Sequence, residues 1–403
     1  MAAERTGVIV VGAGPVGLTA AYLLGHHGIP FTLIAAEPVL ATDLRASTFH
    51  PPTLDMLDVH GLAAPLVAQG LVSQTWQIRL HRTGERAEFD LAAIAGDTRY
   101  PFRLQCEQSR LCALLLDRIR ADGRGEVLLG WQVDAVSQDG AVATVTARPI
   151  DAPEAEPRTF AAPYVIGADG SRSAVRAAAG IAFKGRTYPE TTVLATTTFP
   201  FEAHLEGLSN VNYVWKEGGT FSLLRLRQLW RCSLYPDGDE SIDEALMPAS
   251  IARKLNEIAP GAGDHPVGET RAYRIHMRIA DSYRAGRLLL AGDAAHVNSP
   301  SGGMGMNGGV HDAFELVSTL AEVWNGADAT LLDRYTRRRR PIAEQEVLAQ
   351  ADRNRARMQE RDDGRRREML HALQRTAADP DTAREHLLRS SMIAGLRRAA
   401  AIT

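Results

Sequence analysis

Three glycines near the start of the chain have the spacing of a dinucleotide-binding turn. They form Gly12-Ala-Gly14-Pro-Val-Gly17, between an apolar run at residues 7–11 and a helix-forming run that begins at Leu18. In such a turn the first glycine allows the tight bend, the second lets the backbone approach a pyrophosphate, and the third packs helix on strand. The helix N-terminus offers N–H donors to an anion. The motif predicts a dinucleotide site; the alternative is a tight strand-to-helix turn without a ligand.

The acidic residue that usually binds the adenosine ribose is displaced in this sequence. A second strand is predicted at residues 31–34, and the acid normally stands at the end of that strand. The aligned residue is Ala35, and Glu37 lies two positions later. Because residues two apart in an extended chain face the same way, we predict that Glu37 takes the ribose-binding role. In the alternative interpretation Glu37 is a solvent-exposed loop residue and another group holds the ribose.

Two later segments place polar residues after apolar, strand-like runs. Asp169-Gly170 follows one such run, and Asp293 follows another. Ligands in open parallel sheets gather at the carboxyl ends of strands, so Asp293 could accept a hydrogen bond from a ligand hydroxyl. The glycine-rich residues 302–307 then lead into a helix expected to begin near Gly308. Glycine lets the main chain lie against a planar ring, and a helix N-terminus stabilises negative charge there.

Taken in order, these three motifs resemble those of the flavoprotein aromatic hydroxylases, the 4-hydroxybenzoate hydroxylase-like group A monooxygenases. The resemblance runs from about Val8 to Pro341 and is weaker in the middle third and the tail. It implies FAD as cofactor, NADPH or NADH as co-substrate, and O₂ activation as a flavin C4a-hydroperoxide. The implied substrate is a small aromatic molecule, whether phenolic, heteroaromatic or polyketide-like. Residues 303–308 also spell a glycine motif, but no acidic strand follows them, so no separate NAD(P)H domain is expected.

The resemblance also implies which residues contact the cofactor. Arg45 matches a family arginine, Gln108 matches a family glutamine near the ribityl phosphate, and Arg176 could neutralise phosphate; each could instead be an ordinary surface residue. Pro300 and the Gly302-Gly303 loop are expected near the flavin reaction site, and His296 beneath it in a structural role. The predicted cofactor-binding set is Gly12, Gly14, Gly17, Glu37, Arg45, Gln108, Asp169, Asp293, Gly303, Gly305, Met306 and Asn307.

The elements that would position these residues indicate an α/β fold. We predict a Rossmann-like FAD-binding lobe with an inserted antiparallel β-sheet substrate lobe and a helical C-terminal tail. The tail from residue 343 is dense in arginine and acids, as in a solvated helix face. The predicted segments are 1–75, 101–179 and 280–345 for the FAD lobe, 76–100 and 180–279 for the substrate sheet, and 346–403 for the tail.

Strand alternation in the middle third suggests which side chains could contact a substrate. Tyr213 and Trp215 would share one face of a strand, and Phe221, Leu223 and Arg225 one face of the next. Aromatic residues on a sheet are also common core residues, which is the alternative interpretation. Pro300 joins this set because the matching family proline lies beside the substrate oxygen.

Composition and charge limit the possible partners and the cellular location of the protein. A net charge of -3 over 403 residues gives no reason to expect nucleic acid or an anionic membrane as partner. No run approaches the length of a membrane span, and the first residues lack the features of a signal peptide, so a cytoplasmic location is expected. The three cysteines, Cys106, Cys112 and Cys232, are expected to be reduced, and no spacing indicates a metal site. The sequence does not determine the oligomeric state, and a homodimer is possible.

Other activities of the same fold compete with hydroxylation. A flavin epoxidase, a Baeyer–Villiger oxygenase and a reductase would all use these motifs, because a fold does not fix a function. The Trp-x-Trp-x-Ile-Pro motif of flavin halogenases is absent from the sequence, which disfavours that branch. A non-catalytic flavin-binding protein is the remaining alternative; Ala35 favours it mildly, and the intact flavin loop argues against it.

Overall fold

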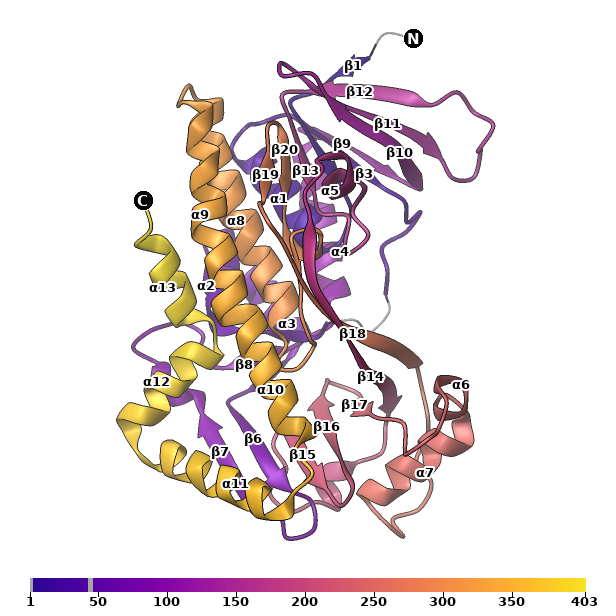
Figure 1. The fold of residues 1–403 in the computed structure, drawn as a ribbon, viewed down its shortest axis with the longest axis vertical. Helices are drawn as coiled ribbons and strands as arrows, with labels where there is room; N and C mark the ends of the chain where they lie inside the picture. Colours follow the sequence, from indigo (N-terminus) through magenta and orange to yellow (C-terminus); the bar gives the residue numbers. More distant parts are fainter. Residues whose placement is uncertain (1–2, 43–45) are drawn as a thin grey trace.

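A six-stranded sheet forms the centre of the upper lobe in the computed structural model, which describes residues 3–42 and 46–403 (Figure 1). Its strands are short and fully buried at the core, and β-branched or leucine side chains fill them, as expected for a sheet covered on both faces. All neighbours are parallel except the edge pair β19–β20. The order is β19 (Arg284–Ala285), β20 (Leu288–Leu290), β13 (Tyr164–Gly167), β2 (Val8–Val11), β3 (Phe31–Ala35) and β9 (Gly125–Leu129).

Three helices pack together against this sheet. Helix α1 (Pro15–His26) contacts both α4 (Gln108–Asp122) and α8 (Met304–Trp324). Helix α8 begins at Met304, four residues before the predicted start at Gly308. The glycines misled the prediction because glycine weakens isolated helices. In this helix a glycine allows close packing against α1 and the Gly292 turn. A Cβ atom on Gly309 would lie only 2.6 Å from the Val16 side chain and 3.0 Å from the Gly292 Cα.

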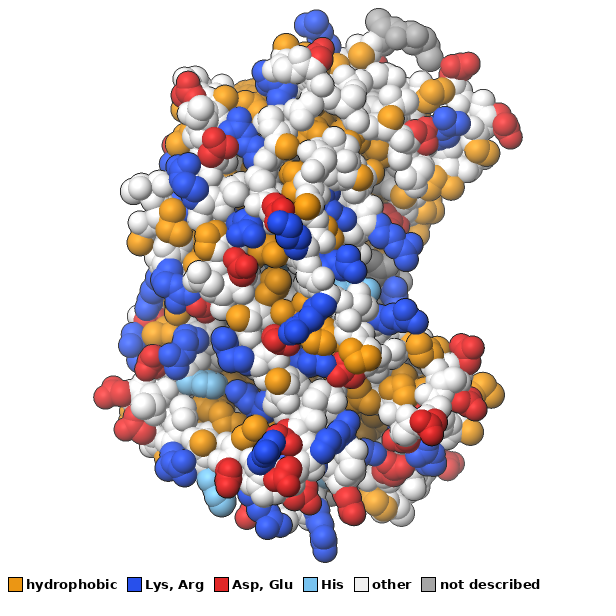
Figure 2. Space-filling view, in the orientation of Figure 1, with side chains coloured by type: hydrophobic (Ala, Val, Ile, Leu, Met, Phe, Trp, Pro, Cys, Tyr) orange, Lys and Arg blue, Asp and Glu red, His pale blue; other side chains and the backbone are white. Residues whose placement is uncertain are grey.

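An eight-stranded sheet forms the lower lobe, and its two longest strands reach up to the first sheet (Figure 1). All its neighbours are antiparallel except the pair β15–β6. In the space-filling view the surface is hollowed between the two lobes, and lysine and arginine side chains border the hollow (Figure 2). The order is β21 (His296–Val297), β18 (Thr270–Ala280), β14 (Phe183–Thr197), β17 (Trp230–Leu234), β16 (Gly219–Arg225), β15 (Val211–Lys216), β6 (Thr75–Leu80) and β7 (Arg86–Asp90).

Two smaller sheets complete the strand content of the described residues. One has the order β4 (Thr48–Phe49), β8 (Arg103–Gln105) and β5 (Leu71–Ser73), and it lies between the lobes. The other has the order β1 (Glu4–Arg5), β12 (Arg158–Ala162), β11 (Ala143–Pro149) and β10 (Trp131–Gln138). Strand β21 pairs with the lower sheet although it lies outside the segments predicted for that lobe. The predicted boundaries between the FAD lobe and the substrate sheet are not tested by this pairing and remain a prediction.

Helices cover the outer face and the base of the lower sheet. Helix α7 (Pro248–Ile258) buries Ile251 and Leu255 against one face. On the other side the chain runs through α9 (Leu332–Ile342), the π-helical turn η5 (Ala343–Leu348), α10 (Ala349–Gln359), α11 (Asp363–Ala378), α12 (Pro380–Ser390) and α13 (Ile393–Ala400). The nearly buried carboxylate of Asp97 anchors this tail by pairing with Arg384 and Arg397, each at 2.7 Å. Within the described residues, none of the helices has the length and apolarity to cross a bilayer.

A buried ionic network supports the segment that joins the two lobes. The carboxylate of Asp312, on α8, pairs with His296 Nε2 at 2.7 Å and Arg339 Nε at 2.7 Å. It also accepts the backbone N–H of Gly292 at 3.2 Å, while Arg339 donates to the Gly308 carbonyl at 3.1 Å. Burial alone would raise the pKa of Asp312, but Arg339 and His296 outweigh it and hold that pKa below its usual value. His296 thus lies in a structural position beneath the loop.

Substituting Asp312→Asn should destabilise the protein by about 3–5 kcal/mol, because it leaves Arg339 buried without a counter-charge. The depressed pKa of Asp312 gives stability that is present above the unfolded-state pKa of about 3.9 and is lost as pH falls through the lower folded-state value. The variant should therefore also lose part of the acid-side pH dependence. Urea denaturation at several pH values measures both effects.

The matched control is Asp333→Asn, which removes an exposed partner of Arg284 whose side chain is 56% accessible. That change should cost no more than about 1 kcal/mol. Equal losses in the two variants would contradict a special role for the buried network.

Candidate active site

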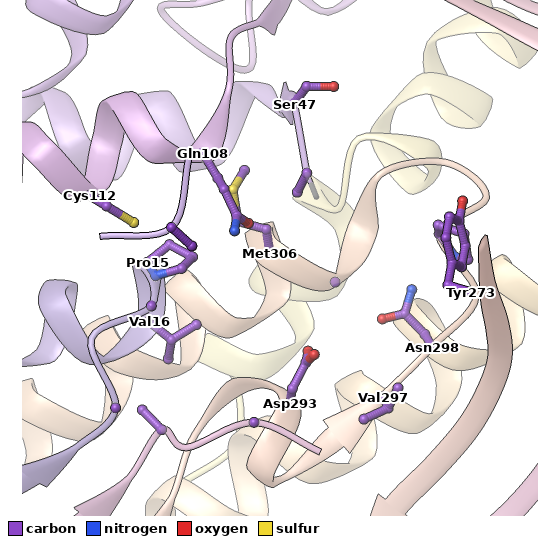
Figure 3. Close-up of a pocket in the computed structure, with 18 of the residues that line it drawn as sticks. Pro15, Val16, Ser47, Gln108, Cys112, Tyr273, Asp293, Val297, Asn298 and Met306 are labelled. Carbon is purple, nitrogen blue, oxygen red and sulfur yellow. The ribbon is translucent and has the colours of Figure 1, made fainter. Parts of the chain in front are cut away.

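One cavity of about 570 Å³ lies between the two lobes and collects residues from every predicted motif. It is lined by the first glycine turn, the Asp169 turn, Asp293, the 300–306 segment and one face of the eight-stranded sheet. Figure 3 shows Gln108 and Met306 toward one side of this cavity, with Tyr273 and Asn298 on the other. Segments that are far apart in the sequence therefore meet around a single space.

The first glycine turn has the geometry that phosphate binding requires. Gly12 has φ +107°, and a Cβ there would overlap the Ala168 carbonyl. A Cβ on Gly17 would overlap the Gly12 carbonyl, so the helix packs directly on the turn. Gly14 lines the cavity and has nothing within 4 Å of an added Cβ. The first turn of α1 contains no acidic residue and no side-chain cap, so its N–H groups can meet an anion at this open position.

Glu37, the predicted ribose-binding acid, lies at the same end of the cavity as the first glycine turn. Glu37 is exposed, lines the cavity beside Ala35, and its backbone carbonyl accepts the N–H of Gly130 at 3.0 Å. This position is compatible with the predicted ribose contact. Gln108, at the start of α4, lines the same cavity (Figure 3). Arg45 lies outside the described residues.

The Asp169 turn is built around a helix cap. One carboxylate oxygen of Asp169 accepts the N–H groups of Ala174 at 2.7 Å and Val175 at 3.2 Å, at the start of α5 (Ala174–Ala178). The other oxygen is buried without a hydrogen-bond partner. Arg176 donates to the carbonyls of Ala294 and Ser171, at 2.8 and 2.7 Å, so it joins this turn to the Asp293 turn and does not line the cavity. The arginine of this turn that lines the cavity is exposed Arg172, which the sequence interpretation passed over.

The glycine-rich segment presents a helix N-terminus to the cavity. Gly302 and Gly303 have φ values of +98° and +67°, and α8 starts directly after them without an acidic residue in its first turn. Residues 302–306 all line the cavity. The unpaired N–H groups of the first helical turn, at residues 304–306, are therefore available to a negatively charged group.

Asn307 holds this helix start in place. Its side chain is fully buried and accepts from His50 N at 2.9 Å and Thr53 Oγ1 at 2.7 Å. It also donates to the carbonyls of Thr48 at 2.8 Å and Gly303 at 2.7 Å. The structure thus commits the Asn307 side chain to the scaffold, and only its main chain could approach the cavity.

A buried histidine fixes the preceding peptide. His50 Nε2 lies 2.9 Å from the Gly302 carbonyl. Burial, together with the nearby charge of Arg103, lowers the pKa of His50 to about 3 although the hydrogen bond opposes this shift. His50 is therefore neutral near pH 7 and donates its Nε2–H to Gly302 without adding charge beneath the cavity.

The eight-stranded sheet supplies the opposite wall. Tyr213 and Phe221 line the cavity as predicted candidates, and Pro300 lines it from the facing segment. Further lining residues on this wall, missed by the sequence interpretation, are Thr192, Ser222, Leu224, Arg231, Ser233, Tyr235 and Tyr273. The signal was present: residues 230–234 read Trp-Arg-Cys-Ser-Leu, and this strict alternation in a buried strand predicts that Arg231 and Ser233 share a polar face.

Three predicted substrate contacts lie away from the cavity. Trp215 is 1% exposed and donates its Nε1–H to the Arg357 carbonyl at 2.9 Å, beneath α10. Leu223 packs in the core against α7. Arg225 pairs with Glu202 at 3.2 Å. Trp215 lies on the same strand face as Tyr213, and Leu223 and Arg225 on the same face as Phe221, so alternation does not tell how far along a strand the cavity extends.

Gly14 and Gly12 offer a direct test of the nucleotide end. Substituting Gly14→Val places a side chain in open cavity space, so we expect weaker FAD binding by tenfold or more, about 1.4 kcal/mol, with an unchanged apoprotein melting temperature. Gly12→Ala forces a Cβ onto a carbonyl at positive φ and should destabilise the fold itself by about 1–3 kcal/mol. Fluorescence titration with FAD and thermal unfolding of both apoproteins separate the two effects. Normal FAD affinity in Gly14→Val would contradict the assignment of this turn.

Comparison with known proteins agrees with this geometry. A family model described as FAD binding domain matches residues 5–350. Para-nitrophenol 4-monooxygenase of Pseudomonas sp. strain WBC-3 is 34% identical over 83% of each chain. 6-Hydroxy-3-succinoylpyridine 3-monooxygenase of Pseudomonas putida strain S16 is 32% identical over 83% of this chain and 84% of its own.

Solved structures agree in fold. The crystal structure of p-nitrophenol 4-monooxygenase from Pseudomonas putida DLL-E4 has a TM-score of 0.90 and 30% identity, covering 98% of both chains. The predicted fold class, with its parallel cofactor sheet, antiparallel substrate sheet and C-terminal helices, is thereby confirmed. The chain belongs to the FAD binding domain family, and it is a flavin-dependent aromatic monooxygenase.

Proposed function

We propose that this enzyme hydroxylates a small, single-ring phenol with O₂, and that NADPH or NADH supplies the electrons. The observation that carries the proposal is the single cavity in which the cofactor turns and a hydroxyl-rich sheet face meet. The same cavity, of about 570 Å³, has to accommodate both FAD and the substrate. The relatives named for nitrophenol and hydroxypyridine substrates support the same class.

In this proposal the nucleotide end binds FAD through main chain and a few side chains. Gly14 and the α1 N-terminus hold the pyrophosphate, Glu37 the ribose, and Asp293 a ribityl hydroxyl. The N–H groups at the start of α8 would stabilise negative charge on the flavin ring. When bound, FAD supplies hydride acceptance and O₂ activation. The wider proposed cofactor set also includes Gly12, Gly17, Arg45, Gln108, Asp169, Gly303, Gly305, Met306 and Asn307.

The substrate ring is proposed to lie between Pro300 and the sheet wall. Tyr213 and Tyr273 line this space, and their hydroxyl groups are the proposed hydrogen-bond partners of the substrate oxygen. Burial raises the pKa of Tyr273, so its hydroxyl stays protonated and can donate. Met358, from α10, helps to close the wall and to exclude water.

NAD(P)H is proposed to reach the flavin from the hollow between the lobes, whose border carries lysine and arginine side chains (Figure 2). Residues 303–308 belong to the glycine-rich start of α8 and not to a second nucleotide-binding turn. This is consistent with NAD(P)H that binds only transiently and has no domain of its own. Exposed Arg172 lies at the cavity and could contact its phosphates. A homodimer remains a prediction, which light scattering would test.

Isotope incorporation tests the proposal. The FAD-loaded enzyme, NADPH and ¹⁸O₂ are combined with a panel of phenols and hydroxypyridines, and products are analysed by mass spectrometry. We expect substrate-stimulated NADPH oxidation and a product carrying one ¹⁸O atom on its ring. The Gly14→Val variant serves as a control with impaired cofactor binding. NADPH oxidation that yields only H₂O₂, or a reduced product without ¹⁸O, across the panel would contradict hydroxylation.

A further inference from the structure

The large cavity shares two of its lining residues with a second, smaller cavity. The second cavity has a volume of about 110 Å³ and lies at the base of the lower lobe, where the β15–β16 hairpin, α7 and the chain just before α11 come together (Figure 1). Phe221 and Tyr235 line both cavities. These two side chains therefore stand between the large cavity and the smaller one.

The eight-stranded sheet is split at this place. Strands β16 and β17 form a ladder that ends at Ser222 and Ser233. Strand β16 continues to Gly219 in pairing with β15, and β17 continues to Leu234 in pairing with β14. Within the described part of the chain the β16–β17 ladder goes no further, so side chains and not paired backbone close the sheet between these strand ends. A split of this kind gives a passage from one side of a sheet to the other.

The side chains that close the split are both uncharged. Phe221 is 2% exposed and packs edge-to-face on the ring of His81, with 5.3 Å between the ring centres. Burial raises the pKa of Tyr235, so its phenol group stays neutral. An aromatic molecule that passes between two such rings does not have to strip water from a charged group. The partition is thus compatible with the passage of an aromatic ring when these two side chains move apart.

The second cavity opens at the surface of the protein. Its lining includes the exposed Asp237 and the tip of the β15–β16 hairpin. The two lysines that line it are matched by carboxylates, since Lys216 pairs with Glu257 and Lys254 with Glu240. Neutralised lysines of this kind fit a passage better than a site that retains an anion.

We propose that the aromatic substrate enters, and its product leaves, through this second cavity and between Phe221 and Tyr235. The inference rests on the proposed function, because it assumes that FAD fills the nucleotide end of the large cavity and the ring the end at the eight-stranded sheet. A ring that came through the hollow between the lobes would have to pass the bound FAD, whereas the split between β16 and β17 leads directly to the sheet wall. NAD(P)H and the aromatic molecule then reach the flavin from different sides of the protein.

Covalent blocking of the mouth tests the inference. Asp237→Cys places a thiol at the opening, which a bulky maleimide then fills, while the three native cysteines are buried and stay unlabelled. The matched control is Asp239→Cys, an exposed position on the same loop that is not among the lining residues of the second cavity. Stopped-flow absorbance follows the binding and release of 4-nitrophenol by each FAD-loaded protein, before and after labelling.

The label on Asp237→Cys should slow association and dissociation by the same factor, at least about tenfold, and leave the Kd unchanged. The reason is that blocking a route alters the barrier but not the free or the bound state. The label on Asp239→Cys should change neither rate. Unchanged rates in labelled Asp237→Cys, or a shift in Kd in place of parallel slowing, would overturn the inference.

A further variant acts on the partition itself. Phe221→Leu keeps an apolar side chain but removes the ring, so both rates should rise while the mouth is open and should fall again when Asp237→Cys is added and labelled. Wild-type rates in folded, FAD-loaded Phe221→Leu would contradict the partition, and the labelling experiment decides the inference even where this variant fails to fold. Parallel slowing in an enzyme that transfers no oxygen refutes only the proposed function, whereas normal hydroxylation without slowing refutes only this inference.

Discussion

The close approach of backbone segments that lack side chains is the constraint on which the site depends. Gly17 packs on the Gly12 carbonyl, and Gly309 packs within van der Waals distance of Gly292. These contacts bring the N-termini of α1 and α8 to the same cavity, from positions almost 300 residues apart. Both helix ends direct unpaired N–H groups into one space, so the backbone itself creates a field that favours an anionic cofactor. A methyl group on Gly17 would overlap the Gly12 carbonyl, and one on Gly309 would overlap the Val16 side chain, so either would displace a helix.

Polar groups beneath the cavity keep this arrangement rigid. Asp312 joins the strand-end loop, α8 and α9, while Asn307 joins the start of α8 to the segment around His50. Each group has its hydrogen bonds or charges matched within the protein, which lowers the cost of burial and leaves few alternative packings. The site is therefore formed by the scaffold before any ligand arrives, as expected where geometry controls the reaction.

Sequence patterns predicted the parts of this structure that local chemistry determines. The apolar runs before Gly12, Asp169 and Asp293 became parallel strands, and the alternating runs in the middle third became an antiparallel sheet. The failures have a common cause, which is tertiary contact. The start of α8 was misplaced because its glycines are stabilised by packing. Trp215, Leu223 and Arg225 were misassigned because alternation does not reveal how far along each strand the cavity extends. Arg231 was missed because charge in a buried strand was not considered.

The C-terminal tail contributes to the cavity wall on the side of the eight-stranded sheet, although it carries none of the predicted cofactor motifs. Met358 reaches the cavity, the Arg357 carbonyl anchors Trp215, and Asp97 clamps the later helices to the body. This part of the cavity wall and the predicted nucleotide turns thus come from separate stretches of the sequence. Mutations along α10 can reshape the back wall without touching the nucleotide turns, so this lineage has a route to new substrates that leaves flavin chemistry intact.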